Sequence, residues 1–286
     1  MPQQQTGTVA VIGAGTMGHG IAQVSAMAGY RVSLYDPQPG AVEKGLARIG
    51  ENLDKGVERG KVNAEDAAAT RARLLATDAV KDAVAGAWLV IEAAPEQMEI
   101  KERIFADVYG FAPEGAVLAT NTSSLSVTRI AAATGAPERV IGLHFFNPVH
   151  IMKLLEVVRG KETSQATLDT ALEYARAIGK EPIVVTDTPG FASSRLGVTL
   201  GLEAIRMVEQ GVASPADIDK AMELGYNHPM GPLRLTDLVG LDVRLGIAEY
   251  LHRELGGDQY EAPELLRRMV AEGKLGKKSG QGFYTW

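Results

Sequence analysis

The first two thirds of the chain alternate short apolar runs with longer stretches of mixed polarity. The apolar runs are rich in β-branched residues and fall at residues 8–12, 31–35, 87–91, 116–119, 139–144, 154–158 and 182–185. The first run shows no polar–apolar alternation, which is typical of a strand covered on both faces. Residues 40–73 and 96–109, and a stretch that ends near residue 28, are predicted to be helical. Strands that alternate with helices predict a doubly wound, mostly parallel α/β sheet.

The character of the chain changes after residue 186. Thr188-Pro189-Gly190 interrupts the pattern, and no further strand is predicted. The segments predicted to be helical are residues 191–210, 215–224, 233–255 and 263–273. We therefore expect an α/β domain over residues 1–186 and an all-helical C-terminal domain over residues 187–286. A length of 286 residues suits two domains.

Composition removes several classes of function. With 29 Lys and Arg against 35 Asp and Glu, the net charge of −6 lacks the basic balance typical of nucleic-acid binders. No apolar run is long enough to span a membrane, and residues 1–7 do not resemble a signal peptide, so we expect a cytoplasmic protein. The absence of cysteine excludes thiol nucleophiles, cysteine-based zinc sites and iron–sulfur clusters. We predict no metal site.

A glycine-rich turn follows the first predicted strand. Gly13, Gly15 and Gly18 form the pattern G-x-G-x-x-G, with Thr16 and Met17 between the last two. The first glycine permits a tight turn, the second permits close approach of a pyrophosphate, and the third permits close packing of helix and strand. The N–H groups at the start of the following helix favour phosphate. These features predict a Rossmann-type dinucleotide-binding domain.

Asp36 ends the second predicted strand, 18 residues after Gly18. A carboxylate there can accept hydrogen bonds from both hydroxyls of the adenosine ribose and would repel a 2′-phosphate, which favours NAD over NADP. Two alternatives stay open at this point. The glycine turn could bind nothing, with Asp36 capping a helix before Pro37, or the cofactor could carry the 2′-phosphate.

Three further polar residues suggest redox chemistry on an alcohol. Ser123 lies in a polar cluster just after a predicted strand, His144 ends another strand, and Glu156 interrupts an apolar run. A dehydrogenase needs a base for the alcohol proton, and histidine suits this role because its pKa is near neutral pH. A carboxylate can orient the imidazole and stabilise its cation. Taken singly, the three residues could equally be a helix cap, a structural histidine and an exposed edge charge.

Longer motifs carry a resemblance that covers the whole chain. They are GAGTMGHGIA (13–22), VIEAAPEQMEIK (90–101), ATNTSSLS (119–126), IGLHFFNPVHIMKLLEVV (141–158), TPGFASSR (188–195), HPMGPLRLTDLVGLD (228–242) and GKKSGQGFYTW (276–286). With these motifs in this order, the chain resembles the 3-hydroxyacyl-CoA dehydrogenase family, in particular its 3-hydroxybutyryl-CoA dehydrogenase branch.

The resemblance implies roles for individual residues. His144 would be the catalytic base, paired with Glu156, and Ser123 would contact the substrate 3-oxygen and the nicotinamide side. The positions that match the surroundings of bound NAD in the family are Glu96, Lys101, Asn121, Asn147 and Lys278.

The resemblance also implies contacts for the rest of the substrate. Asn52, Lys55 and Arg59 fall on the helical pair that contacts CoA in the family, although a solvated helix face would give the same pattern. Ser194 stands where the family usually has Asn near the substrate. Serine is shorter, so a water can fill the gap.

The implied reaction is the reversible conversion of (S)-3-hydroxyacyl-CoA and NAD⁺ into 3-oxoacyl-CoA and NADH. The resemblance, together with apolar residues on several faces of segments 196–208 and 233–251, implies a homodimer through the helical domain, which would also bind substrate. One alternative is a dehydrogenase of free hydroxy acids, which uses a lysine from the helical domain; residues 189–195 contain none. The other is a non-catalytic NAD-binding relative.

Overall fold

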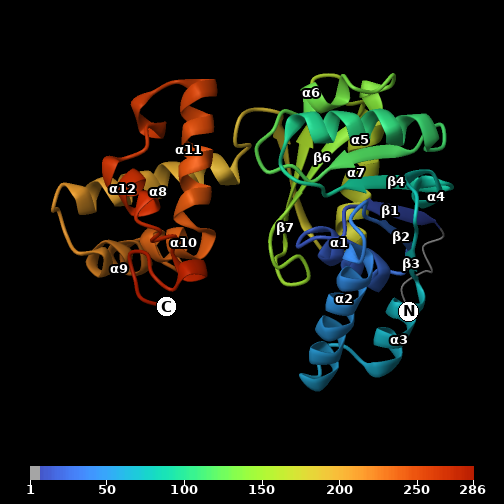
Figure 1. The fold of residues 1–286 in the computed structure, drawn as a ribbon, viewed down its shortest axis with the longest axis horizontal. Coiled ribbons are helices and arrows are strands. Elements are labelled where there is room, and N and C mark those ends of the chain that lie inside the picture. Colours follow the sequence, from blue (N-terminus) through green and yellow to red (C-terminus); the bar gives the residue numbers. More distant parts are fainter. Residues whose placement is uncertain (1–6) are drawn as a thin grey trace. The chain divides into compact units, whose positions relative to one another are not determined.

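The computed structural model of the chain describes residues 7–286 and divides into two compact units (Figure 1). The first unit ends at Asp187 and the second runs from Thr188 to Trp286, so the division lies one residue after the expected position. None of the helices in the described part of the chain is long and apolar enough to cross a membrane.

The first unit is built on an eight-stranded sheet with the order β3-β2-β1-β4-β5-β6-β7-β8. The strands are β1 (Thr8–Ile12), β2 (Arg31–Tyr35), β3 (Leu74–Ala76), β4 (Ala87–Glu92), β5 (Val117–Thr120), β6 (Val140–Phe145), β7 (Leu154–Arg159) and β8 (Glu181–Thr186). All neighbouring pairs are parallel except β6 and β7, which are antiparallel. The strand order reverses between β1 and β4, and in such sheets ligands bind where the order reverses.

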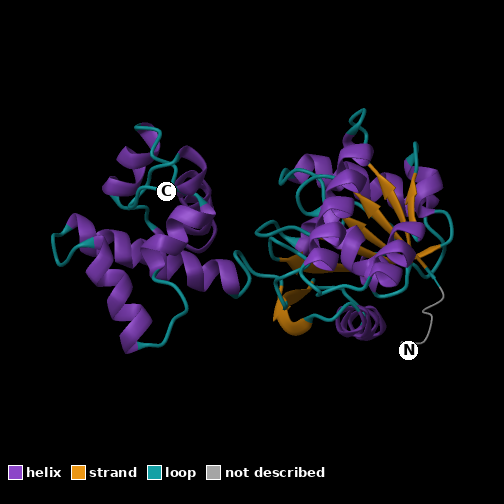
Figure 2. Cartoon of the chain, turned by 90° about the horizontal axis from the view of Figure 1, so that it is seen from below, coloured by secondary structure: helices purple, strands orange, loops and turns teal. Residues whose placement is uncertain are grey.

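Helices pack along the strands of this unit (Figure 2). They are α1 (Gly18–Met27), α2 (Ala41–Glu58), α3 (Ala64–Ala72), α4 (Val80–Val84), α5 (Met98–Phe111), α6 (Val127–Ala131) and α7 (Gln165–Ala177), with a 3₁₀ turn at Pro137–Arg139. Val9 and Val11 of β1 lie in one core with Ile21 of α1 and Tyr174 of α7. The expected alternation of strands and helices is therefore confirmed.

Some elements of the first unit were not predicted. Strand β3 has three residues, too few to show a periodic pattern, and helices α4, α6 and α7 lie where no element was predicted. The helical stretch expected over residues 40–73 is two helices, α2 and α3, separated by a turn in which Gly60 adopts a φ of 64°. Strand β8 forms one edge of the sheet, and its Val184 is 50% exposed.

The second unit is built of helices. They are α8 (Ser193–Glu209), α9 (Pro215–Gly225), α10 (Pro232–Val239), α11 (Leu241–Leu255) and α12 (Glu264–Ala271), with 3₁₀ turns at Asp258–Tyr260 and Lys277–Ser279. Leu202, Leu233 and Leu251 are fully buried in its core. The single helix expected over residues 233–255 is wrong. Gly240, with a φ of 104°, separates α10 from α11 because this backbone conformation cannot continue a helix.

Candidate functional site

A cleft of about 670 Å³ opens at the carboxyl ends of the strands around the β1–β4 reversal. Its lining brings together residues from distant parts of the sequence. Those predicted to act there are Gly13, Gly15, Thr16, Met17, Asp36, Glu96, Asn121, Ser123 and His144. Ile100 and Ile104, one turn apart on α5, contribute an apolar wall. Because polar groups converge on an apolar cleft at the reversal point, this is the candidate binding site of the first unit.

The geometry of the glycine turn leaves room for a pyrophosphate. A Cβ on Gly13 would lie 2.6 Å from the Ala93 carbonyl oxygen, and a Cβ on Gly18 would lie 1.7 Å from the Gly13 carbonyl oxygen. A side chain at Gly18 would push the start of α1 away from the end of β1, and one at Gly13 would push the turn away from the segment that follows β4. At Gly15 the Cβ position has no atom within 4 Å and faces the cleft. A phosphate can therefore approach the backbone at the start of α1.

Asp36 lies in the cleft at the end of β2. Its Oδ2 accepts a hydrogen bond of 2.8 Å from the Ala14 N–H, and its Oδ1 accepts one of 2.9 Å from the Gln38 N–H. Each carboxylate oxygen has a second acceptor site that suits a ribose hydroxyl. The N-cap of α2 is Gly40, so Asp36 does not cap that helix. The residues present thus fit the adenosine half of NAD.

Glu96 holds the loop that carries Ser123. Its Oε1 accepts hydrogen bonds from the Thr122 hydroxyl (2.6 Å), from the Ser123 N–H (2.8 Å) and from the Ser123 hydroxyl (3.1 Å). Burial opposes ionisation of Glu96, but the Lys101 ammonium and the hydrogen bonds from Thr122 and Ser123 outweigh it, so the pKa of this carboxyl is lowered. Glu96 is therefore an anionic anchor for the loop at neutral pH.

Lys101 lies beneath this loop and is absent from the cleft lining. It is 1% exposed, and its Nζ lies 2.7 Å from Glu92 Oε1 and 3.4 Å from Glu96 Oε2. Glu92, also 1% exposed, accepts a 2.6 Å hydrogen bond from the Thr120 hydroxyl. Lys101 thus joins two carboxylates below the cleft. Glu92, which ends the apolar run of β4, was not predicted to be a site residue. A single charged residue at the end of a buried strand nevertheless indicates a buried charge with a partner.

His144 and Glu156 form a buried pair across the antiparallel strands β6 and β7. They are directly opposite in register, so their side chains leave the sheet on the same face. His144 Nδ1 lies 2.6 Å from Glu156 Oε2. Glu156 is 0% exposed and His144 is 7% exposed, and the His144 ring packs 4.5 Å from the Phe146 ring. Glu156 is therefore not an exposed edge charge.

Two asparagines predicted near NAD differ in their surroundings. Asn121 lines the cleft, and its Oδ1 accepts a 3.0 Å hydrogen bond from the Phe145 N–H, which ties the end of β5 to the end of β6. Asn147 is exposed, precedes a cis proline and is not part of the cleft lining.

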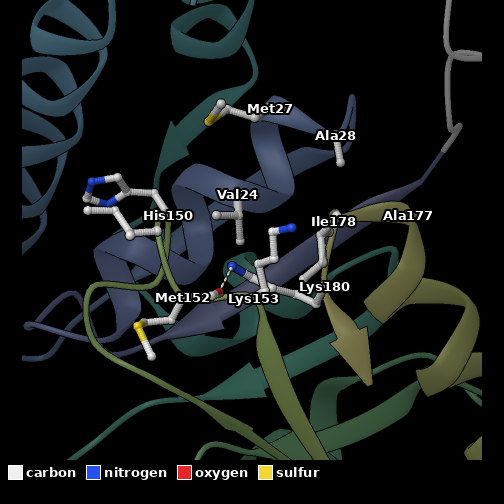
Figure 3. Close-up of a pocket in the computed structure, with 11 residues that line it drawn as sticks. Val24, Met27, Ala28, His150, Met152, Lys153, Ala177, Ile178 and Lys180 are labelled. Carbon is white, nitrogen blue, oxygen red and sulfur yellow. Dashed lines mark hydrogen bonds between the residues drawn. The ribbon is translucent and has the colours of Figure 1, made fainter. Parts of the chain in front are cut away.

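A buried lysine holds the loop after Asn147 through hydrogen bonds to its backbone. A second cavity, of about 360 Å³, lies between the end of α1, this loop and the end of α7 (Figure 3). At its base Lys180, 8% exposed, donates to the carbonyl oxygens of Met152 (2.7 Å) and Val149. Burial lowers the pKa of Lys180. Because this loop joins β6 to β7, Lys180 supports the strand pair that carries His144 and Glu156.

The residues predicted to contact CoA lie on α2, outside the cleft lining. Asn52, Lys55 and Arg59 are spaced by three and four residues and so share one helix face, with Arg59 at the C-cap. Asn52 donates a 3.1 Å hydrogen bond to Gln23 of α1, and Lys55 lies 4.0 Å from the Glu51 carboxylate.

Two predicted site residues belong to the helical unit. Ser194 lies in the first turn of α8. Lys278 donates a 2.6 Å hydrogen bond to Asp242 at the start of α11. Burial opposes ionisation of Asp242, but hydrogen bonds from Lys278 and from the backbone prevail and lower its pKa.

Two family models match the chain in succession. The first, described as 3-hydroxyacyl-CoA dehydrogenase, NAD binding domain, matches residues 8–188. The second, the C-terminal domain of 3-hydroxyacyl-CoA dehydrogenase, matches residues 190–286.

Individual relatives are similar over almost the whole chain. A 3-hydroxybutyryl-CoA dehydrogenase of Clostridioides difficile is 45% identical over 278 residues, covering 97% of this chain and 99% of that protein. The crystal structure of (S)-3-hydroxybutyryl-CoA dehydrogenase PaaH1 from Ralstonia eutropha matches with a TM-score of 0.94 and 41% identity, covering 98% of each chain. A 3-hydroxyadipyl-CoA dehydrogenase of Escherichia coli is 44% identical, covering 98% of this chain and 59% of that protein.

Proposed function

The chain belongs to the 3-hydroxyacyl-CoA dehydrogenase family, and we propose that it interconverts (S)-3-hydroxyacyl-CoA and 3-oxoacyl-CoA with NAD, with 3-hydroxybutyryl-CoA as a substrate. The observation that carries this proposal is the His144–Glu156 pair. His144 lines the same cleft as the dinucleotide turn and Asp36. A substrate carbon bound in this cleft can therefore lie close to both the base and the cofactor.

The cleft offers a place for each part of the cofactor. The backbone around Gly15, Thr16 and Met17 suits the pyrophosphate and Asp36 suits the adenosine ribose. Asn121, which accepts a hydrogen bond from the residue after His144, and Ser123 line the same cleft. Bound NAD⁺ supplies the acceptor for the hydride that leaves C3 of the substrate. The remaining positions proposed to lie near NAD are Gly13, Gly18, Glu96, Lys101, Asn147 and Lys278.

His144 moves the proton that accompanies the hydride. Because Glu156 holds Nδ1, the proposed base is Nε2, which takes the hydroxyl proton during oxidation and returns it during reduction. The buried Glu156 carboxylate orients the ring and stabilises the imidazolium that forms.

Ser123 is proposed to contact the 3-oxygen of the substrate. In this structure its hydroxyl donates to Glu96, so the serine oxygen presents an acceptor to a 3-hydroxyl group. Rotation of the hydroxyl would instead present a donor to the 3-oxo group. Ser194 is proposed as a second contact of the substrate, and Asn52, Lys55 and Arg59 as contacts of CoA, where the two cations suit phosphate groups.

The proposal is tested by following NADH oxidation with acetoacetyl-CoA and with free acetoacetate. We expect turnover of the CoA thioester to dominate. A better rate with free acetoacetate would favour a hydroxy-acid dehydrogenase. Tight NADH binding with turnover of neither substrate would favour a non-catalytic relative.

A further inference from the structure

The cavity of about 360 Å³ beside the loop after Asn147 has no role in the reaction described above (Figure 3). It lies wholly within the first unit, between the end of α1, this loop and the end of α7. The described residues that line it are all different from those that line the cleft with His144. Its volume is in the range of cavities that bind small molecules, so it is a separate candidate binding site.

The polar side chains that line this cavity are all basic. They are His150, Lys153 and Lys180, and no Asp or Glu is among the described lining residues. The chain as a whole is acidic, with a net charge of −6, so this excess of basic groups is a local property. Burial lowers the pKa of His150, and the nearby His19 and Lys180 lower it further. The cavity therefore presents a positive field that suits an anion.

Lys180 has a donor left for such an anion. Its ammonium donates to the backbone carbonyl oxygens of Met152 and Val149, which uses two of its three N–H groups. The carboxylate next to it in sequence, Glu181, lies 3.6 Å from the Lys153 ammonium instead. Because a buried cation without a counter-ion is costly, an anion at the third N–H group would stabilise Lys180.

The other side chains that line the cavity are apolar. They are Val24, Met27, Ala28, Ile151, Met152, Ala177 and Ile178. Ile151 is 65% exposed and Met27 is 43% exposed, so part of this apolar surface is left in water. An aliphatic chain that extends from the anionic group would cover it. A cationic group beside apolar walls thus fits a ligand with a negative end and an apolar chain.

We propose that this cavity binds a small carboxylic acid with a short aliphatic chain, with the carboxylate at Lys180 and the chain against Met27 and Ile151. A carboxylate oxygen can accept the third N–H group in a charge-assisted hydrogen bond. Inorganic phosphate fits less well because it has no apolar part to place against the walls. The inference uses no residue of the cleft, so it does not depend on the proposed reaction. An acid bound there would contact the loop that joins the strands of His144 and Glu156.

The test measures the binding of hexanoate to the full-length protein by isothermal titration calorimetry. We expect one saturable site per chain. Binding of hexan-1-ol, which has the same chain without the charge, and of inorganic phosphate should be much weaker. Lys180→Met should weaken hexanoate binding roughly tenfold or more, because a hydrogen bond to a charged group is lost. The matched control is Lys81→Met, a change at an exposed lysine of α4, which should keep the affinity.

A second variant tests the cavity and leaves the three basic side chains in place. Ala177→Leu adds bulk to the cavity at the end of α7, and leucine is compatible with a helix. It should also weaken hexanoate binding. Ala166→Leu, at an exposed position in the first turn of the same helix, should not. Ala177→Leu decides the question if Lys180→Met does not fold.

Each other result overturns the inference. Hexanoate binding that neither Lys180→Met nor Ala177→Leu weakens would place the acid elsewhere. Equal affinity for hexan-1-ol would mean that the cavity has no use for the charge, and equal affinity for phosphate would mean that it has no use for the chain. Absence of binding at millimolar hexanoate would also refute the site. None of these outcomes bears on the proposed function, which is tested separately with acetoacetyl-CoA.

Discussion

His144 and Glu156 are twelve residues apart in the sequence and 2.6 Å apart in the structure. The antiparallel turn of the chain after β6 places them in direct register. A histidine with a buried acidic partner suits the role of a base better than a lone histidine at the end of a strand, because the carboxylate selects the tautomer and stabilises the cation. At the scale of single residues, this pair makes the strongest prediction.

Replacement of His144 by alanine should lower kcat by at least about 10²-fold, the usual contribution of a positioned acid–base group. NADH should still bind, because the glycine turn and Asp36 are untouched. The measurement is steady-state reduction of acetoacetyl-CoA, together with NADH fluorescence on binding. His252→Ala, a change at an exposed histidine of α11, is the control and should behave like wild type. A His144→Ala enzyme with near-normal kcat would refute the assigned base.

A second prediction at this scale concerns Glu96 and pH. Its pKa is lowered in the folded state, so the ionised carboxylate stabilises the fold above its unfolded-state pKa, and this contribution is lost as the pH falls through the folded-state pKa. Glu96→Gln should therefore unfold more easily than wild type at neutral pH.

The difference in unfolding free energy between wild type and Glu96→Gln should be smaller at an acid pH at which the wild-type carboxyl is protonated than at neutral pH. Chemical denaturation at the two pH values measures this. Glu99→Gln, a change at an exposed carboxylate of the neighbouring helix α5, is the control. A difference that grows as the pH falls would contradict the assignment.

At the scale of elements, the break between α10 and α11 depends on the backbone conformation of one residue. Gly240 has a φ of 104°, which side chains other than hydrogen tolerate poorly. Gly240→Ala should cost about 1–3 kcal/mol of unfolding free energy. Gly246→Ala, in the interior of α11 with open space around its Cβ position, should be neutral or stabilising. Equal effects of the two substitutions on thermal unfolding would show that the conformation at Gly240 is not what matters.

Two buried lysines near the cleft act on whole elements. Lys101 of α5 joins Glu92 and Glu96 below the serine loop, and Lys180 fastens the loop between β6 and β7. Lys101 is surrounded by carboxylate oxygens of two residues, and Lys180 donates to two backbone carbonyl oxygens of a single loop. Nothing in the local sequence around either lysine distinguishes it from a solvated one.

At the scale of the whole molecule, the helical unit exposes apolar side chains that suit an interface. Leu196 is 71% exposed, Val239 is 44% exposed and Val243 is 43% exposed. The proposed homodimer through this unit would cover such groups, since large apolar areas are seldom left in water. Sedimentation should give about twice the chain mass of 30.4 kDa at micromolar concentration. A single species of one chain mass would reject the dimer.

Features that depend on residues close together in the chain could be predicted from the sequence. The strand–helix alternation, the glycine turn and the position of Asp36 depend on side chains close together in the chain, whose periodicity and backbone preferences act locally. The resemblance identified the family and the candidate residues. A cytoplasmic location stays a prediction.

The tertiary structure decided the relationships between segments that are distant in the sequence. The pairing of His144 with Glu156 comes from strand register, and the burial of Lys101 comes from the packing of α5 against β4. The hydrogen bond from the buried Arg244 of α11 to the Gly197 carbonyl oxygen forms only when α8 and α11 lie together. Contacts of this kind depend on how the sheet and helices close around one another, and a sequence pattern with a period of two or 3.6 residues carries no information about that closure.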